Sequence, residues 1–268
     1  MTPPYRLARN LGRFPELFVA WQQTPAFRQL VARYLDIGGP PYPFDIPITG
    51  GGILRVGSRQ EVKVFWEIYV RRCYRLPTEC RIVVDAGANV GIFSVWAAKQ
   101  VPEVRIIALE PFPATVAALR HNLHVNQLEE RVQVVQVALG AQSGERLMRT
   151  DGESPQRGLE PADEEGSAGR PVIKVPCVSL ADFFDRHRLV SVDMLKMDIQ
   201  GSEWQVLLSA PSSLLRSIRR IQFEYHEVHA RFGYTPERLF AHLTTAGHVL
   251  TFRREDERRT GLAIFDRV

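Results

Sequence analysis

A short run between two apolar stretches carries the residue types best suited to bind a ligand. The segment VVDAGANVGIFS, residues 83–94, leads an apolar strand into a turn with two glycines and then into a predicted helix. Glycine lets a backbone turn tightly and lets a ligand approach it closely. We therefore expect this turn to line a cofactor site, with Gly87, Ala88, Asn89 and Gly91 as the contacting residues.

The charge of this turn distinguishes two classes of cofactor. The dinucleotide fingerprint GxGxxG needs three glycines and places a pyrophosphate at the helix N-terminus. Here Asn89 stands in place of the second glycine, and Asp85 precedes the turn. A carboxylate aimed into the turn would repel a pyrophosphate, but it would suit the ammonium end of a methionine moiety, directly or through water. The turn therefore favours S-adenosylmethionine over NAD.

The next apolar stretch ends in a second acid. VRIIALEP, residues 104–111, closes on Glu110 and Pro111. In nucleotide-binding α/β folds an acid at this position accepts hydrogen bonds from ribose hydroxyls. Taken singly, Asp85 could be a helix cap and Glu110 a surface acid, but the two acids at these spacings together favour a nucleoside site. We expect Glu110 and Pro111 to contact the cofactor.

Three polar residues at the ends of later strands are candidates for chemistry on the acceptor. Ligands of open α/β sheets lie beyond the carboxyl ends of the strands, so we expect Asp198, Glu224 and His226 to converge near the transferred methyl. Side chains alternate along a strand, which points Glu224 and His226 to one side and Phe223 and Tyr225 to the other.

Asp198, Glu224 and His226 allow two ways of activating an acceptor hydroxyl. In the first, His226 is the general base, because an imidazole pKa of about 6.5 suits proton removal at neutral pH, and Asp198 or Glu224 orients its ring. In the second, the three side chains hold Mg²⁺ or Ca²⁺, which binds the acceptor oxygen and lowers its pKa. The sequence leaves both routes open, and Asp198 could instead cap the following helix.

The chain around these residues alternates strands and helices, which implies a parallel sheet covered on both faces. The predicted strands are 81–87, 104–111, 131–139, 192–199, 219–226, 248–254 and 261–268, and the predicted helices between them are 94–101, 113–126, 202–209 and 236–246. The last two strands form a hairpin on an otherwise parallel sheet. This order predicts an α/β, Rossmann-like class I methyltransferase fold with a seven-stranded, mostly parallel sheet and a C-terminal antiparallel hairpin.

Two segments stand outside this alternation. Residues 1–78 are predicted to form a small N-terminal helical cap on the substrate side, with a strand at 53–56 and a helix at 61–74. Residues 79–268 are predicted to form the cofactor-binding domain. Residues 151–171 are rich in Gly, Pro, Glu and Ser, which predicts a long flexible loop, either an insertion or a lid over the substrate.

Three aromatic residues lie in predicted helices and allow two interpretations. Trp66, Tyr69 and Trp204 could line an acceptor pocket, although aromatic residues in such patterns are more often part of a core. We expect them in the core.

Composition excludes several classes of protein. The 268 residues are 45% hydrophobic and 24% charged, with no apolar run long enough for a membrane span, which is typical of a globular protein. The net charge of +4 comes from arginines scattered among acids, so a nucleic-acid partner is not favoured. Three cysteines without CxxC spacing predict neither a zinc site nor a disulfide framework, and with no secretory signal we expect a cytoplasmic protein.

Several motifs in order resemble those of the FkbM-family methyltransferases. They are VVDAGANVGIFS, LEPFPATVAALRHNLHVN, VALGAQSGE, VSLADFF and LKMDIQGSEWQVL, and LKxDxxGxE is the most family-specific of them. Gln200 stands where the family often has an acid, while Asp198 and Glu203 are retained. The resemblance implies the methyltransferase fold, S-adenosylmethionine as cofactor and O-methylation of natural products, sugars or glycolipids. It also implies cofactor contacts by Glu110 at the ribose and by Ala138 and Leu139 at the adenine, with Asn122 or Asn126 in support.

These features together predict an S-adenosylmethionine-dependent O-methyltransferase that acts on a hydroxyl of a small molecule. The alternatives are a nucleic-acid ribose 2′-O-methyltransferase, suggested by the basic charge, an NAD-binding oxidoreductase, and a non-catalytic cofactor-binding module. The sequence leaves the oligomeric state open, with a homodimer as one alternative.

Overall fold

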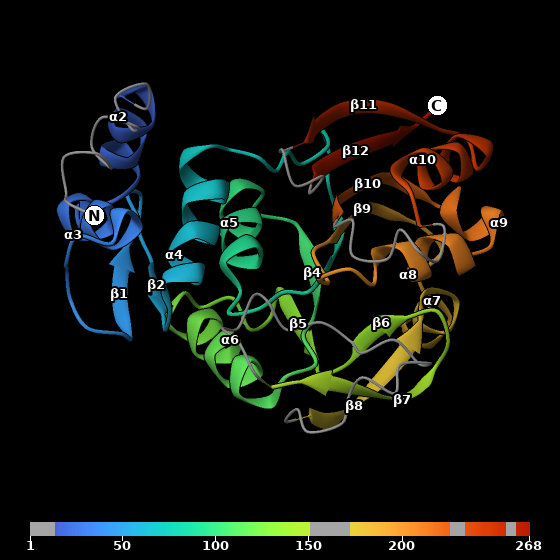
Figure 1. Ribbon diagram of the computed structural model, residues 1–268, viewed down its shortest axis with the longest axis horizontal. Coiled ribbons are helices and arrows are strands. Elements are labelled where there is room, and N and C mark those ends of the chain that lie inside the picture. The colour runs from blue at the N-terminus through green and yellow to red at the C-terminus, as the bar shows by residue number, and fades with distance from the viewer. Residues whose placement is uncertain (1–13, 151–171, 226–233, 256–260) are drawn as a thin grey trace.

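Seven strands form the central sheet in the order β11-β12-β10-β9-β3-β4-β5 (Figure 1). The computed structural model describes residues 14–150, 172–225, 234–255 and 261–268. The strands are β3 (Ile82–Ala86), β4 (Arg105–Leu109), β5 (Val132–Val135), β9 (Val192–Met197), β10 (Ile218–Tyr225), β11 (His248–Glu255) and β12 (Gly261–Arg267). The five strands from β5 to β10 pair in parallel, and β12 pairs antiparallel with both β10 and β11. This confirms the predicted class I methyltransferase fold.

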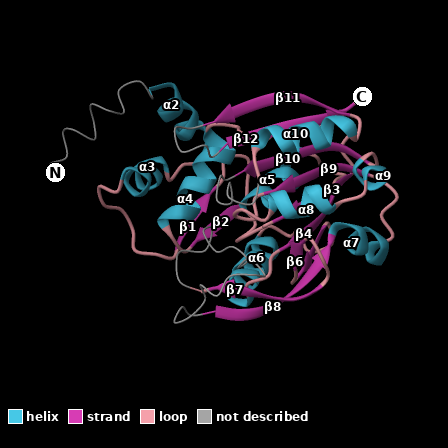
Figure 2. Ribbon diagram, turned by 45° about the vertical axis from the view of Figure 1, so that its right-hand side comes forward, coloured by secondary structure: helices cyan, strands magenta, loops and turns pink. Residues whose placement is uncertain are grey.

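Helices cover both faces of this sheet. Successive residues of a strand point to opposite faces, and here the residues on both faces are apolar. Val83 and Met194 belong to one buried cluster, and Val84 and Leu195 belong to the other. The first cluster includes side chains of α4 (Arg59–Phe65), η2 (Trp66–Val70), α5 (Ile92–Gln100) and α6 (Pro113–Val125). The second includes side chains of α7 (Leu180–His187), α8 (Glu203–Ser209), α9 (Ser212–Leu215) and α10 (Pro236–Thr245), which lie along the sheet in Figure 2.

A second, three-stranded sheet replaces part of one predicted strand. The prediction of one strand over 131–139 is wrong, because the chain turns after β5, where the Val137 N–H donates to the Val135 carbonyl at 3.0 Å. The residues beyond this turn form β6, which joins a sheet of order β6-β8-β7 beside α7 (Figure 1). Its strands are β6 (Ala138–Gly140), β7 (Gly144–Arg149) and β8 (Val172–Ser179).

The N-terminal segment packs beside α5 and α6, at the left of Figure 1. It contains α2 (Phe14–Gln23), α3 (Phe27–Leu35) and the antiparallel pair β1 (Phe44–Pro47) and β2 (Ile53–Val56). The strand at 53–56 matches its prediction. The helix predicted over 61–74 begins at Arg59, and its last turn, η2, is a π-helix that ends at Val70.

Asn122 of α6 and Asn126, the residue after α6, hold this segment in place. Asn122 accepts from the Arg55 N–H at 2.8 Å and donates to the carbonyls of Arg55 and Val90. Asn126 donates to the Ile53 carbonyl at 2.6 Å and accepts from the Ile53 N–H at 3.2 Å. Both side chains therefore join α6 to β2.

Some predictions fall outside the described residues. The loop 151–171 and the candidate His226 lie there, so the structure does not describe them. Among the helices that are described, none combines the length and apolarity needed to cross a bilayer.

Candidate functional site

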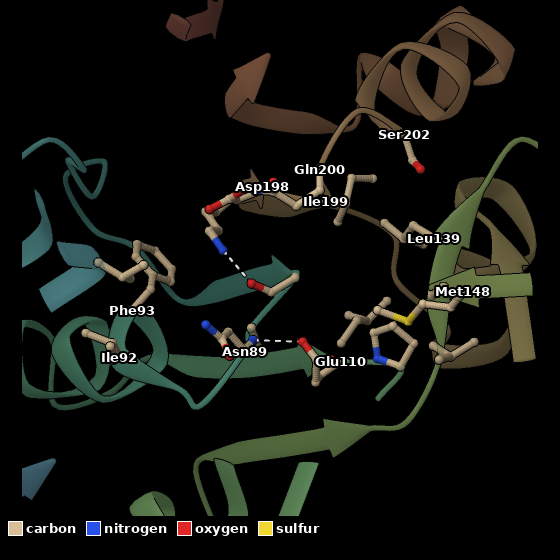
Figure 3. A pocket seen from close by; sticks show the side chains of 18 of the residues that line it. Asn89, Ile92, Phe93, Glu110, Leu139, Met148, Asp198, Ile199, Gln200 and Ser202 are labelled. Atoms are coloured by element: carbon tan, nitrogen blue, oxygen red, sulfur yellow. Dashed lines mark hydrogen bonds between the residues drawn. The ribbon is translucent and has the colours of Figure 1, made fainter. Parts of the chain in front are cut away.

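A cavity opens at the carboxyl ends of β3, β4 and β9, where ligands of open α/β sheets bind. Its lining includes Gly87, Ala88, Asn89, Glu110, Pro111, Ala138 and Leu139, all of them predicted cofactor contacts. Figure 3 shows Asn89 beside Glu110, with Leu139 and Met148 on one side of the cavity and Ile92 and Phe93 on the opposite side. The cavity therefore extends from the second sheet toward α5.

The two glycines of the turn have different physical reasons to be glycine. Gly87 has φ +74° and lies so close to β9 that a Cβ there would overlap the Asp198 carbonyl oxygen. Gly91 has φ +86°, and a Cβ would overlap the Leu119 side chain of α6. Gly87 thus brings two strand ends together beneath the cavity. Gly91, predicted to contact the cofactor, packs against α6 and is not among the residues that line the cavity.

Glu110 connects the carboxyl end of β4 to the turn that follows β3. Its two carboxylate oxygens accept from the backbone N–H groups of Asn89 and Phe112, each at 3.0 Å. Figure 3 shows the hydrogen bond from Asn89. Burial raises the pKa of Glu110 to about 7, although these two hydrogen bonds act in the opposite direction. Each oxygen keeps a further lone pair, so the side chain can still accept a hydroxyl.

Asp85 does not point freely into the turn, which differs from what the sequence suggested. Its Oδ1 lies 2.9 Å from Lys196 Nζ, and its Oδ2 accepts from the Ser94 hydroxyl at 2.7 Å. The Lys196 ammonium also donates to the Gly87 carbonyl at 2.9 Å. Asp85 is fully buried and does not line the cavity, whereas Lys196 does. The carboxylate predicted to meet a ligand ammonium is thus already paired with an ammonium of the protein.

Lys196 is the site residue that sequence reasoning missed. Burial acts to lower its pKa, but the carboxylates of Asp85, Asp198 and Glu224 outweigh it and raise the pKa above the ordinary lysine value. The parallel register pairs Asp85 with Lys196 directly. A lysine inside the apolar strand MLKM was the available signal, since a buried lysine needs a counter-charge.

Asp198 lines the cavity at the end of β9, and the following turn is held by Glu203. The Asp198 Oδ1 accepts from Gln200 Nε2 at 2.8 Å. The buried Glu203 carboxylate accepts from the backbone N–H groups of Ile199 and Gly201, each at 2.8 Å. Gln200 and Gly201 have φ values of +56° and +103°, so the turn is tight. Glu203 therefore fixes the backbone that carries Asp198.

Glu224 follows Asp198 on the neighbouring strand, because Phe223 pairs with Met197 in the parallel register. Phe223 and Tyr225 are fully buried in the core, while Glu224 is partly exposed, as strand alternation predicted. Burial, and next the Asp198 carboxylate, raise the pKa of Glu224 well above its usual range. Glu224 is not one of the residues that line the cavity.

The predicted metal set receives no support. Within the described ranges, no group of three or more His, Cys, Asp or Glu side chains is arranged to hold an ion. The third predicted ligand, His226, lies outside those ranges.

The remaining candidates are divided between the cavity and the core. Trp66, Tyr69 and Trp204 are at most 4% exposed and do not line the cavity, in agreement with their predicted core position. Tyr74 and Phe93 line it instead, with their rings 5.2 Å apart. Asn126, predicted in support of the cofactor, lies outside the cavity lining, because β2 engages its amide.

Comparison with known proteins identifies the family. The methyltransferase FkbM domain model matches residues 85–254. The 31-O-demethyl-FK506 methyltransferase FkbM of Streptomyces tacrolimicus is 27% identical over 69% of this chain and 82% of its own length. Methyltransferase sdnD of Sordaria araneosa is 27% identical over 61% of this chain and 74% of its own length.

Among solved structures, a methyltransferase FkbM from Methylobacillus flagellatus aligns with a TM-score of 0.48 and 14% identity. That alignment covers 97% of this chain and 62% of the other. The family model alone spans more than half of the sequence. The chain therefore belongs to the FkbM methyltransferase family.

Proposed function

We propose that this chain is an S-adenosylmethionine-dependent O-methyltransferase that acts on a hydroxyl of a small-molecule acceptor. The observation that carries the proposal is the single cavity that brings together the glycine turn, the buried acid Glu110 and the strand-end acid Asp198. A class I methyltransferase needs these parts at the carboxyl ends of its strands.

The residues present fit the cofactor. Glu110 offers carboxylate oxygens for ribose hydroxyls, and Ala138, Leu139 and Met148 offer an apolar wall for an adenine ring. Gly87 and Ala88 leave the backbone of the turn accessible beside the amino-acid end. Asp85 contributes through Lys196, which it holds at the cavity wall.

The bound cofactor would supply a methyl group on a sulfonium: the acceptor oxygen forms a bond to the methyl carbon as the carbon–sulfur bond breaks, its electron pair staying on sulfur. The protein must align the acceptor and receive the hydroxyl proton. Asp198 lines the cavity and carries a carboxylate for that proton. His226, the residue after β10, is the alternative base, and separate variants distinguish the two.

An oxygen acceptor on a small molecule is supported by two observations. The Streptomyces relative is named as a methyltransferase of 31-O-demethyl-FK506, a name that describes methylation of an oxygen. In this chain the wall near α5 is largely apolar, with Val64, Ile68, Ile92 and Phe93, which suits a compact organic acceptor.

Calorimetry with S-adenosylhomocysteine and, separately, with NAD tests the cofactor class. We expect S-adenosylhomocysteine to bind and NAD not to bind; the reverse result would overturn the proposal. Incubation with ¹³C-methyl S-adenosylmethionine and a panel of hydroxylated natural products then tests the acceptor atom. A new methyl resonance in the O-methyl region is expected, whereas an N-methyl or C-methyl resonance would contradict O-methylation.

A further inference from the structure

The wall of the cavity beside the glycine turn carries a cation at a place where a cofactor ammonium was expected to bind. Lys196 Nζ lies 2.9 Å from the Asp85 carboxylate, which was expected to receive that ammonium, and 2.9 Å from the Gly87 carbonyl. A second ammonium placed there would meet a like charge. This part of the wall therefore carries a cation that an anionic ligand group could meet, while the Asp198 carboxylate lines the cavity nearby.

The pair is arranged with its positive end toward the cavity. Asp85 is 0% exposed and is held from behind by Ser94 of α5, while Lys196 lines the cavity. An ammonium has three donors. Nζ donates to the Gly87 carbonyl at 2.9 Å, forms the ion pair with Asp85 at 2.9 Å, and makes only a long hydrogen bond to the Ala86 carbonyl at 3.4 Å, which a ligand oxygen could replace. Lys196 can therefore donate to a ligand without losing its two short contacts.

We propose that Lys196 binds the α-carboxylate of the cofactor's amino-acid part, with Asp85 as the positioning residue that holds the ammonium in place. This assignment rests on the proposed function. The α-carboxylate is the one anionic group of S-adenosylmethionine and of S-adenosylhomocysteine. A charge-assisted hydrogen bond to it is of the stronger kind found in proteins.

The test uses two nucleosides that differ only in this carboxylate. S-adenosyl-3-thiopropylamine is S-adenosylhomocysteine without its carboxylate, and it keeps the ammonium, the sulfur and the adenosine. Dissociation constants measured by calorimetry give a ratio between the two ligands. For the wild-type chain we expect S-adenosylhomocysteine to bind about tenfold to a hundredfold more tightly.

Variants then assign that ratio to one side chain. Lys196→Gln alone would leave the buried Asp85 carboxylate without its partner, so the main variant is the double change Asp85→Asn with Lys196→Gln, which removes both charges together. We expect its ratio to fall to about one. Lys196→Arg keeps the cation and Ser94→Ala keeps the ion pair, so both should keep most of the ratio. Circular dichroism verifies folding of each variant.

The outcomes separate this assignment from the proposed function. A wild-type ratio near one, or a large ratio that persists in the double variant, would overturn the role of Lys196 while S-adenosylhomocysteine binding still supports the methyltransferase. Equal weakening of both nucleosides in the double variant, with the ratio unchanged, would mean that the pair only shapes the turn. Folded wild-type protein that binds neither nucleoside would overturn the proposed function and this assignment with it.

Discussion

At the scale of single residues, Glu110 is subject to two opposing influences. Removal from water favours its neutral form, while the N–H groups of Asn89 and Phe112 favour the carboxylate. Burial is the larger effect, so the pKa reaches about 7 and the side chain changes charge near neutral pH. A ligand that donates hydroxyls to Glu110 should pull this balance back toward the carboxylate.

This predicts that cofactor affinity depends on pH. If ribose hydroxyls donate to the ionised Glu110, S-adenosylhomocysteine should bind about tenfold more tightly at pH 8 than at pH 6. At pH 8 most Glu110 side chains are already ionised, whereas at pH 6 most must first lose a proton. Glu110→Gln should bind more weakly and with little pH dependence over this range. Calorimetry across the range measures both, and a wild-type profile as flat as that of Glu110→Gln would contradict the placement of ribose at Glu110.

A second residue-scale prediction concerns the proton acceptor. If Asp198 takes the hydroxyl proton, Asp198→Asn should lower turnover about 100-fold or more, with a much smaller change in S-adenosylhomocysteine affinity. His226→Ala is the matched comparison, and a larger loss in that variant would assign the base to His226 instead. Initial rates with the acceptor found in the ¹³C screen give the measurement. Equal loss of rate and cofactor affinity in Asp198→Asn would indicate a binding role.

At the scale of elements, the turn after β9 shows what the LKxDxxGxE motif does. Glu203 begins α8, yet its carboxylate reaches back to the N–H groups of Ile199 and Gly201 and stabilises a turn with two left-handed residues. This turn positions Asp198 in the lining of the cavity. Glu203, six residues after the end of β9, is thus part of the scaffold that positions Asp198.

Glu203→Ala would leave two N–H groups without their acceptor, so we expect the free energy of unfolding to fall by about 2–4 kcal/mol and cofactor binding to weaken. Glu203→Gln keeps one acceptor oxygen and should lose less. Urea unfolding followed by circular dichroism compares the two. If the alanine variant unfolds at the wild-type urea concentration, the turn does not depend on Glu203.

The same elements explain how far the sequence could predict the structure. Short, largely apolar runs such as residues 82–86 and 192–197 favour buried parallel strands where strands and helices alternate, and they were predicted within one or two residues. The break after Val135 was missed because the apolar pattern continues through it, and the pairing of β6 with β8 is a long-range contact. Lys196 was missed for a related reason: its meaning depends on the strand beside it.

One local signal could have improved the prediction. Ser179 caps α7 by accepting from the Asp182 N–H at 3.1 Å, and the sequence S-L-A-D is a recognisable helix start. The amide contacts of Asn126 with β2, in contrast, join residues 73 positions apart and have no local sign. Resemblance alone could not separate Asn126 from the cofactor site.

At the scale of the whole molecule, an ionic network joins the N-terminal segment to the C-terminal hairpin. Glu67 of η2 pairs with Arg71 and with Arg254 of β11, and the Arg71 guanidinium also reaches Glu16 of α2 at 3.1 Å. Cys73 donates to the same Glu67 carboxylate. The segment that supplies Val64 and Ile68 to the cavity is therefore held from two sides.

This network predicts a division between acceptor and cofactor binding. Glu67→Ala removes the shared carboxylate, so Arg71 and Arg254 lose a partner and η2 should move more freely against β11. The glycine turn, Glu110 and Lys196 do not depend on Glu67, so S-adenosylhomocysteine affinity should stay within about twofold. The KM for the acceptor should rise about fivefold to tenfold, since Ile68 of η2 lines the cavity.

Arg254→Ala is the control for this prediction, because it removes one half-exposed partner and leaves the pair between Glu67 and Arg71 intact. Exposed ion pairs contribute little, so its KM should stay close to that of the wild type. Loss of S-adenosylhomocysteine affinity in Glu67→Ala would mean that the N-terminal segment supports the cofactor as well. An unchanged acceptor KM would mean that η2 keeps its position through apolar packing alone, since Trp66 and Ile68 are almost completely buried.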